Sequence, residues 1–159
     1  MKLIPQNWFR KAAGAVRAFG GRRAAHLRLG TRGERLACRL LEELGLEILA
    51  RNYAGPDVEI DIAAREDGVL CFIEVKTRHR ALFARPGAAV GYEKRKRLVR
   101  TAHLYLREIG RPPIPYRFDI VEIILDRRLR DIRLHRNAFT ENDLHRPAAE
   151  SFPDLLLDD

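Results

Sequence analysis

Residues 58–78 read VEIDIAAREDGVLCFIEVKTR and predict a β-hairpin. Both halves of this stretch alternate between apolar and polar residues, which is typical of strands with one covered face. Asp67-Gly68 lies between them and predicts a tight hairpin turn, because both central residues of such a turn need a positive φ. With these residues in the loop, Glu66 pairs with Val69, and the remaining pairs of the hairpin follow by counting.

Counting back along both strands places Asp61 opposite Glu74 and Glu59 opposite Lys76. Like charges directly opposite each other destabilise a sheet. A divalent cation between the carboxylates would relieve this repulsion, and their hard oxygen atoms are the ligands that Mg²⁺ prefers. The hairpin therefore predicts a metal site formed by Asp61 and Glu74, with Lys76 beside it.

The alternative is that the charged residues form the solvated face of an exposed hairpin. Ala63, Leu70 and Phe72 share that face by alternation, so we expect it to be partly covered, while Ile60 and Ile62 point to the opposite, core side. A metal at a covered edge could activate water and neutralise charge on a phosphate. A lysine beside it could orient or deprotonate that water, or stabilise the transition state, and these are the parts needed for phosphodiester hydrolysis.

The composition describes a soluble globular protein of 159 residues, 46% hydrophobic and 33% charged, which predicts a single domain. No apolar run approaches the roughly 18 residues of a membrane span, so we expect no membrane association. Cys38 and Cys71 both occupy apolar positions, which indicates buried thiols in the reducing cytoplasm rather than a disulfide framework.

The net charge of +8 predicts a polyanionic partner. Basic residues gather in an N-terminal arm over residues 1–29, which contains a candidate amphipathic helix between Trp8 and Phe19. Acidic residues gather in a C-terminal tail over residues 137–159, interpreted as a solvated tail. The core domain is expected between them, over residues 30–136.

Apolar spacing predicts helices over residues 31–44 and 93–109 and, besides the hairpin, strands over residues 47–53, 116–125 and 129–134. The order is helix, three strands, helix, two strands. This order favours an α/β or α+β sheet with helices packed against it.

Glu34 has two interpretations. Thr31-Arg32-Gly33-Glu34 fits a capping box, in which the Thr and Glu side chains satisfy backbone donors at a helix start. Glu34 also lies on the buried stripe of the expected helix, where a carboxylate could point into an interior site. The spacing leaves both roles open.

A basic run on the second helix follows closely after the hairpin. Such a run is usually a solvated face, but here contact with a phosphate backbone is a second interpretation. Lys94 shares a helix side with Leu98 and Tyr105 and is expected to face the site. The candidate nucleic-acid-binding residues are Arg78, Lys94, Arg95, Lys96, Arg97 and Arg100. Asp119 is expected to form an ion pair with a nearby arginine, and the five histidines show no zinc spacing.

Several motifs resemble the YraN-like bacterial family of the PD-(D/E)XK, or restriction-endonuclease-like, nuclease superfamily. The resemblance covers about residues 30–125 and rests on Gly33-Glu34, Glu59-Ile60-Asp61, Phe72-Ile73-Glu74-Val75-Lys76-Thr77-Arg78 and Arg117-Phe118-Asp119. It implies an α/β fold with a mixed central sheet flanked by helices, and Asp61, Glu74 and Lys76 as catalytic residues. Glu34 matches an acidic residue that many relatives carry on the first helix, which favours a site role for it. Val58 departs from the Gly usual in the family.

The residues and the resemblance together predict a Mg²⁺- or Mn²⁺-dependent endonuclease acting on DNA or structured nucleic acid, with DNA favoured over RNA. Asp61 and Glu74 would bind the metal, Glu34 would assist, and Lys76 would act on the water or the transition state. No small-molecule ligand is expected, and a homodimer is compatible with the sequence. The alternatives are a non-catalytic nucleic-acid-binding protein on a nuclease-like scaffold, and a structural partner of a larger assembly that uses the N-terminal arm.

Overall fold

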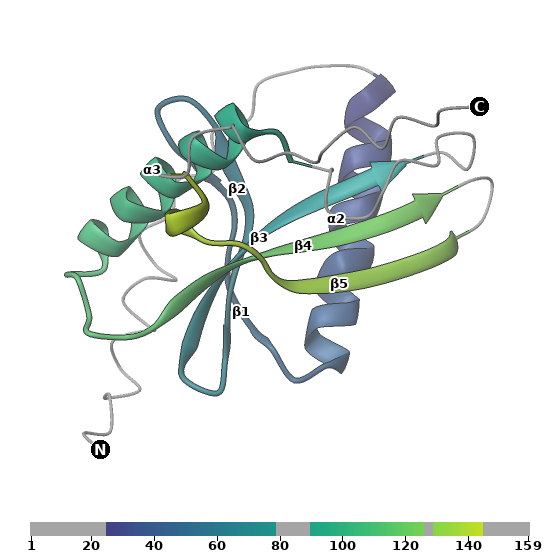
Figure 1. Cartoon of the computed structure of the whole chain (residues 1–159). Coiled ribbons are helices and arrows are strands. Elements are labelled where there is room, and N and C mark those ends of the chain that lie inside the picture. The colour runs from purple at the N-terminus through teal and green to yellow at the C-terminus, as the bar shows by residue number, and fades with distance from the viewer. Residues whose placement is uncertain (1–24, 79–89, 126–128, 145–159) are drawn as a thin grey trace, which may run out of the picture.

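The computed structural model describes residues 25–78, 90–125 and 129–144, which form a mixed sheet between two long helices (Figure 1). The elements in chain order are α2 (Ala25–Glu43), β1 (Glu47–Ala54), β2 (Glu59–Glu66), β3 (Val69–Arg78), α3 (Tyr92–Glu108), β4 (Tyr116–Leu125), β5 (Leu129–Phe139) and the short 3-10 helix η1 (Glu141–Leu144). The predicted α/β class is confirmed, and the arrangement is consistent with a restriction-endonuclease-like fold.

The five strands are ordered β1-β2-β3-β4-β5. Neighbouring strands are antiparallel except β3 and β4, which are parallel and are joined through α3. A parallel pair needs a crossover connection, and α3 provides it over one face of the sheet, while α2 covers the other (Figure 1). None of the helices in the described ranges is long and apolar enough to cross a membrane.

The hairpin turn forms as predicted. Asp67 and Gly68 have φ values of 48° and 83°, and Glu66 pairs with Val69. Side chains alternate along β3, so that Phe72 packs in the cluster under α3 and Ile73 packs in the cluster under α2. The hairpin therefore contributes to both halves of the core.

The prediction that Ile60 and Ile62 point to the same side of β2 is wrong. Ile62 packs on the α2 side, but Ile60 packs on the α3 side, although alternation predicts a common face. The strand changes face at Asp61, which lies opposite Asn52 of β1, a residue with a left-handed φ of 50°. The side chain of Val58 packs against the same α3-side cluster, which accommodates this departure from the family pattern.

Two predicted boundaries need correction. Helix α2 begins at Ala25, within the segment assigned to the N-terminal arm, rather than at Thr31. At the other end, β5 continues to Phe139, whose buried ring stacks on Phe118, and η1 follows to Leu144. The core therefore extends past residue 136. The sequence did not indicate this end of β5, because apolar and polar residues alternate only weakly along the strand. Residues 1–24 of the arm and residues 145–159 of the tail lie outside the described residues.

Candidate metal and nucleic-acid site

Asp61 and Glu74 meet where the β2–β3 ladder stops. The paired residues end at Ile62 and Ile73, and beyond them the backbone N–H of Val75 donates to Asp61 Oδ2 at 2.7 Å. The carboxylate thus replaces a backbone acceptor in the ladder. The predicted pairing of Glu59 with Lys76 does not form: Glu59 pairs with Ala54 and is exposed, since the strands separate before reaching it.

Glu74 is the most buried member of the site, with 3% of its surface exposed. Its Oε1 atom lies 2.8 Å from Lys76 Nζ and also accepts a hydrogen bond from the Lys94 ammonium. Its Oε2 atom is buried and has no hydrogen-bond partner. A buried carboxylate oxygen without a donor is costly, so this atom marks a place where a ligand could bind.

Asp61 is a half-buried carboxyl with a strongly altered affinity for protons. Burial and the charge of Glu74 raise the pKa of Asp61 to about 7, although the Val75 N–H and Lys94 oppose this shift. An additional positive charge would favour the ionised form. The two carboxylates therefore have the electrostatics expected of a site that receives a cation.

Glu34 approaches the same place from α2. Because α2 begins at Ala25, Thr31 lies inside the helix, and the predicted capping-box role of Glu34 is wrong. The charge of Glu34 contributes to the raised pKa of Asp61, and its Oε2 atom lies 4.0 Å from Arg51.

Gly33 explains how α2 comes this close to the sheet. A Cβ atom at Gly33 would lie 2.0 Å from Thr77 Oγ1 of β3, so any larger residue would push the helix outward. In the sequence, Gly33 stands out only as part of the Gly33-Glu34 motif. A glycine inside a helical stretch was the available signal, since glycine is unfavourable there unless packing requires it.

The described residues offer a divalent metal only part of a ligand set. Among the described residues, no cluster of three or more His, Cys, Asp and Glu side chains is arranged to hold a metal, so Glu34 does not complete a ligand set with Asp61 and Glu74. Mg²⁺ is commonly held by one or two carboxylates, with waters and phosphate oxygens as its other ligands. Asp61 and the unpartnered Glu74 Oε2 fit that smaller set.

Lys94 lies in the first turn of α3 and faces the site, as the helical spacing predicts. Burial acts to lower the pKa of Lys94, but its hydrogen bond and ion pair with Glu74 more than offset this effect and raise it. The ammonium therefore stays charged. It contacts the oxygen of Glu74 that Lys76 also contacts, on the side opposite the unpartnered atom.

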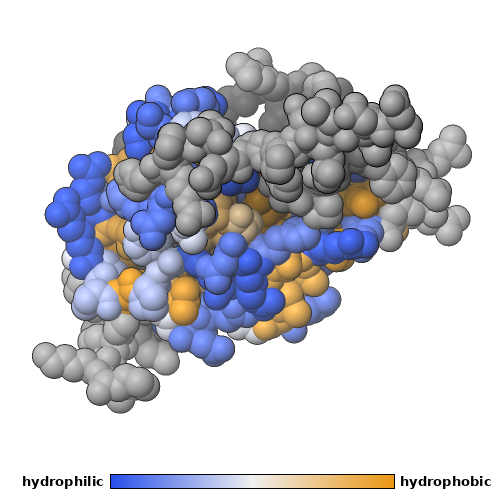
Figure 2. Space-filling view, viewed as in Figure 1, coloured by the Kyte–Doolittle hydropathy of each residue, from blue (hydrophilic) through white to orange (hydrophobic). Residues whose placement is uncertain are grey.

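The other predicted nucleic-acid-binding residues differ in the contacts they make. Arg78 lies 3.5 Å from Glu122, and Arg100 lies 2.7 Å from Asp57. The guanidinium of Arg95 lies over the Phe139 ring, 5.3 Å from its centroid. Lys96 and Arg97 are exposed on α3, where hydrophilic side chains cover the helix (Figure 2).

Comparisons with known proteins place this site within a family. The model of the uncharacterised protein family UPF0102 matches residues 33–123. The chain belongs to this family. The UPF0102 protein of Symbiobacterium thermophilum is 46% identical over 114 residues, which cover 70% of this chain and 96% of that protein. The UPF0102 protein of Chloroherpeton thalassium is 38% identical over 112 residues, which cover 70% and 82%.

UPF0102 is the YraN family, so the predicted family resemblance is confirmed, and its placement in the nuclease superfamily is consistent with this match. The UPF0102 match begins at Gly33, which packs α2 against β3, and includes Glu34, Asp61, Glu74 and Lys76. The N-terminal arm lies outside the match. The candidate site thus lies wholly within the part of the chain that defines the family.

Proposed function

We propose that this UPF0102 protein is a metal-dependent endonuclease that hydrolyses phosphodiester bonds of DNA or structured nucleic acid, with DNA as the preferred substrate. The observation that carries the proposal is the buried, unpartnered Oε2 atom of Glu74 beside Asp61, whose pKa is raised by burial and by Glu74. A divalent cation would turn this costly arrangement into a favourable one.

In this proposal Asp61 and Glu74 hold Mg²⁺ or Mn²⁺, which would lower the pKa of a bound water and offset charge on the phosphate. Lys76 is anchored by Glu74 and remains 25% exposed, so its ammonium can reach a phosphate oxygen or orient the attacking water. Lys94 holds the same carboxylate in position and can release it to contact the phosphate. Glu34 does not bind the metal directly. Its negative charge acts at longer range and favours a cation and its bound water at the site.

The proposal is tested by cleavage of branched, single-stranded and duplex DNA, and of structured RNA, in Mg²⁺ and in Mn²⁺. Asp61→Asn and Lys76→Met should each lower the cleavage rate by at least about a hundredfold, because each removes charge that acts on the transition state. Glu59→Gln is the matched control, since Glu59 is an exposed carboxylate on the same strand as Asp61. Equal cleavage by wild type and Asp61→Asn would contradict the proposal.

One observation favours a second candidate, a nucleic-acid-binding protein without catalysis. The Lys94 ammonium already neutralises part of the Glu74 charge, and no complete ligand set exists among the described residues. Calorimetric titration with Mn²⁺ separates the two candidates. Heat that is present in wild type and absent in Asp61→Asn supports the nuclease, whereas salt-sensitive DNA binding with no heat supports the binding protein.

A further inference from the structure

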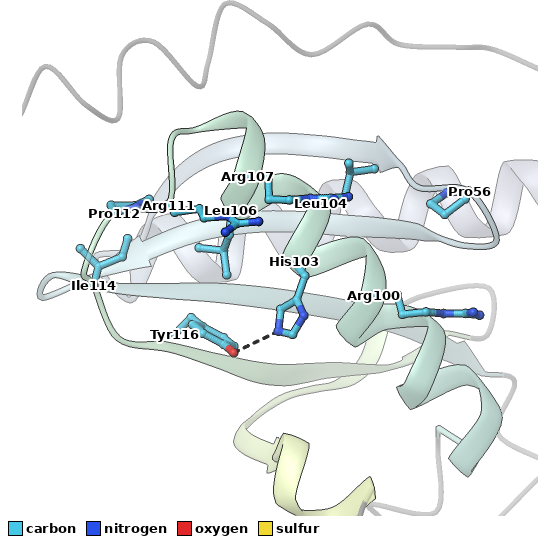
Figure 3. Close-up of a pocket in the computed structure, with 10 residues that line it drawn as sticks. All are labelled: Pro56, Arg100, His103, Leu104, Leu106, Arg107, Arg111, Pro112, Ile114 and Tyr116. Atoms are coloured by element: carbon cyan, nitrogen blue, oxygen red, sulfur yellow. Dashed lines mark hydrogen bonds between the residues drawn. The ribbon is translucent and has the colours of Figure 1, made fainter.

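A pocket of about 610 Å³ lies at the far end of α3 from the carboxylates (Figure 3). Its apolar wall includes Leu104 and Leu106 of α3, and Tyr116 of β4 lies opposite. The volume is in the range of small-molecule sites, roughly 300–1,000 Å³. The proposed nuclease mechanism makes no use of this pocket.

The polar side of the pocket is positively charged. Arg107 and Arg111 line it, and within the described ranges neither guanidinium forms an ion pair with a carboxylate. Arg100, at another edge, is already paired with Asp57. Two such arginines beside an apolar wall suit a ligand that combines a flat apolar body with a negative charge.

The aromatic part of the wall is held rigidly. Tyr116 donates a hydrogen bond to Glu141 Oε1, and His103 Nε2 lies 2.6 Å from the same oxygen. Figure 3 shows His103 and Tyr116 pointing toward each other, joined by their 3.3 Å contact. These contacts tie α3, β4 and η1 together and fix the position of the Tyr116 ring in the wall.

The distance along α3 between the pocket and the carboxylates indicates that the ligand is part of a longer nucleic-acid strand. Lys94 contacts Glu74 at one end of the helix, and Arg107 lies thirteen residues further along, a rise of about 20 Å. This equals the rise of about six stacked nucleotides of one strand. The exposed Lys96 and Arg97 lie at the carboxylate end of that path.

We propose that the pocket receives an unpaired nucleotide of the nucleic-acid substrate, with the base against Leu104, Leu106 and Tyr116 and the phosphate between Arg107 and Arg111. This inference rests on the proposed nuclease function and adds a substrate class: nucleic acid with an unpaired segment about six nucleotides from the cleaved bond. The bases of an intact duplex are stacked and paired, so they cannot enter. The basic N-terminal arm is a poorer occupant because its charge repels the arginines.

The test measures binding in the presence of a metal chelator, so that its result does not depend on cleavage. Fluorescence anisotropy compares a blunt duplex with the same duplex carrying a single-stranded thymidine tail. R107A/R111A should weaken binding of the tailed duplex by about tenfold or more, because both the phosphate contact and base stacking are affected. Binding of the blunt duplex should change no more than in R35A/R39A, a matched pair of exposed arginines on α2.

Leu104→Glu provides an independent check, because it keeps both arginines and places a carboxylate at the apolar wall. It should cause the same selective loss, with the fold verified by circular dichroism. Equal loss for tailed and blunt duplexes, or no loss, would overturn the proposal. Removal of residues 1–24 could also tighten binding of the tailed duplex. If Leu104→Glu abolished that gain, the N-terminal arm would be the occupant of the pocket and the proposal would be overturned.

Discussion

The two ends of the β2–β3 hairpin shift the pKa values of partly buried carboxyl groups in opposite directions. At the turn, Glu66 pairs with Arg136 and Arg117, and these contacts lower its pKa to about 2. At the open end, burial and Glu74 raise the pKa of Asp61 to about 7. The same hairpin therefore stabilises one carboxylate as an ion and makes the other costly to ionise.

Asp119 and Glu74 extend this contrast. Asp119 is fully buried, and both of its oxygens accept from Arg117 Nε, at 3.0 and 2.9 Å, while the Asn137 N–H donates at 2.9 Å. This confirms the ion pair expected from sequence. Glu74 is almost as buried, yet one of its oxygens has no partner. The comparison separates a carboxylate whose oxygens both have donors from one that leaves a buried oxygen without a partner.

The largest expected effect comes from breaking the complete cluster. Arg117→Met should lower the free energy of unfolding by about 3–5 kcal/mol, because it leaves Asp119 buried without its counter-ion. Lys94→Met at the other end should cost only about 1 kcal/mol, since Glu74 keeps its contact with Lys76. Urea unfolding monitored by circular dichroism measures both values.

Lys94→Met should also tighten Mn²⁺ binding, because it removes a positive charge that competes for Glu74. The double variant R117M/D119L serves as the control at the turn and should recover part of the stability lost in Arg117→Met. Equal losses in Lys94→Met and Arg117→Met would contradict the distinction between the two clusters.

A smaller effect concerns pH. In the absence of metal, Asp61 in the folded protein stays protonated up to about pH 7, whereas in the unfolded chain it ionises near pH 4. Its contribution to stability therefore falls as the pH rises through this window and is lost above it. At pH 8 we expect Asp61→Asn to be more stable than wild type by about 2 kcal/mol, with the difference vanishing near pH 4.

Thermal unfolding across this pH range, with and without Mn²⁺, measures the difference. Because the metal binds the ionised carboxylate, Mn²⁺ should stabilise wild type more at pH 8 than at pH 6 and should have little effect on Asp61→Asn. A difference between the two proteins that did not vary with pH would count against the raised pKa of Asp61.

The smallest expected effect tests how α2 reaches the open end of the hairpin. Gly33→Ala places a methyl group against Thr77 and should cost about 1–2 kcal/mol, with weaker Mn²⁺ binding as Glu34 is displaced. Gly30→Ala is the matched control on the same helix: its Cβ would meet nothing within 4 Å, so the change should gain about 0.5–1 kcal/mol. If chemical denaturation gave the same change in the free energy of unfolding for both variants, the close approach of α2 to β3 at Gly33 would not contribute to stability.

Much of the fold could be predicted because it depends on local patterns. The Asp67-Gly68 turn requires left-handed residues, and the alternation around it leaves few alternatives to a hairpin. Helix α3 and strand β4 also follow from apolar spacing, within one residue of the expected bounds. The start of α2 and the end of β5 were missed, because weakly apolar segments give little periodic signal.

The hairpin, the α/β order and the proximity of Asp61 and Glu74 follow from the order of amino acids alone, since turn type and strand period fix which residues lie near each other. The end of the β2–β3 ladder at Ile62, the change of face along β2 at Asp61 and the choice of Glu74 as the partner of Lys94 became visible only in the folded molecule, although helical spacing already turned Lys94 toward the site. These features depend on contacts between elements far apart in the chain. Local pattern carries no information about them, because burial and charge compensation arise only when the layers pack together.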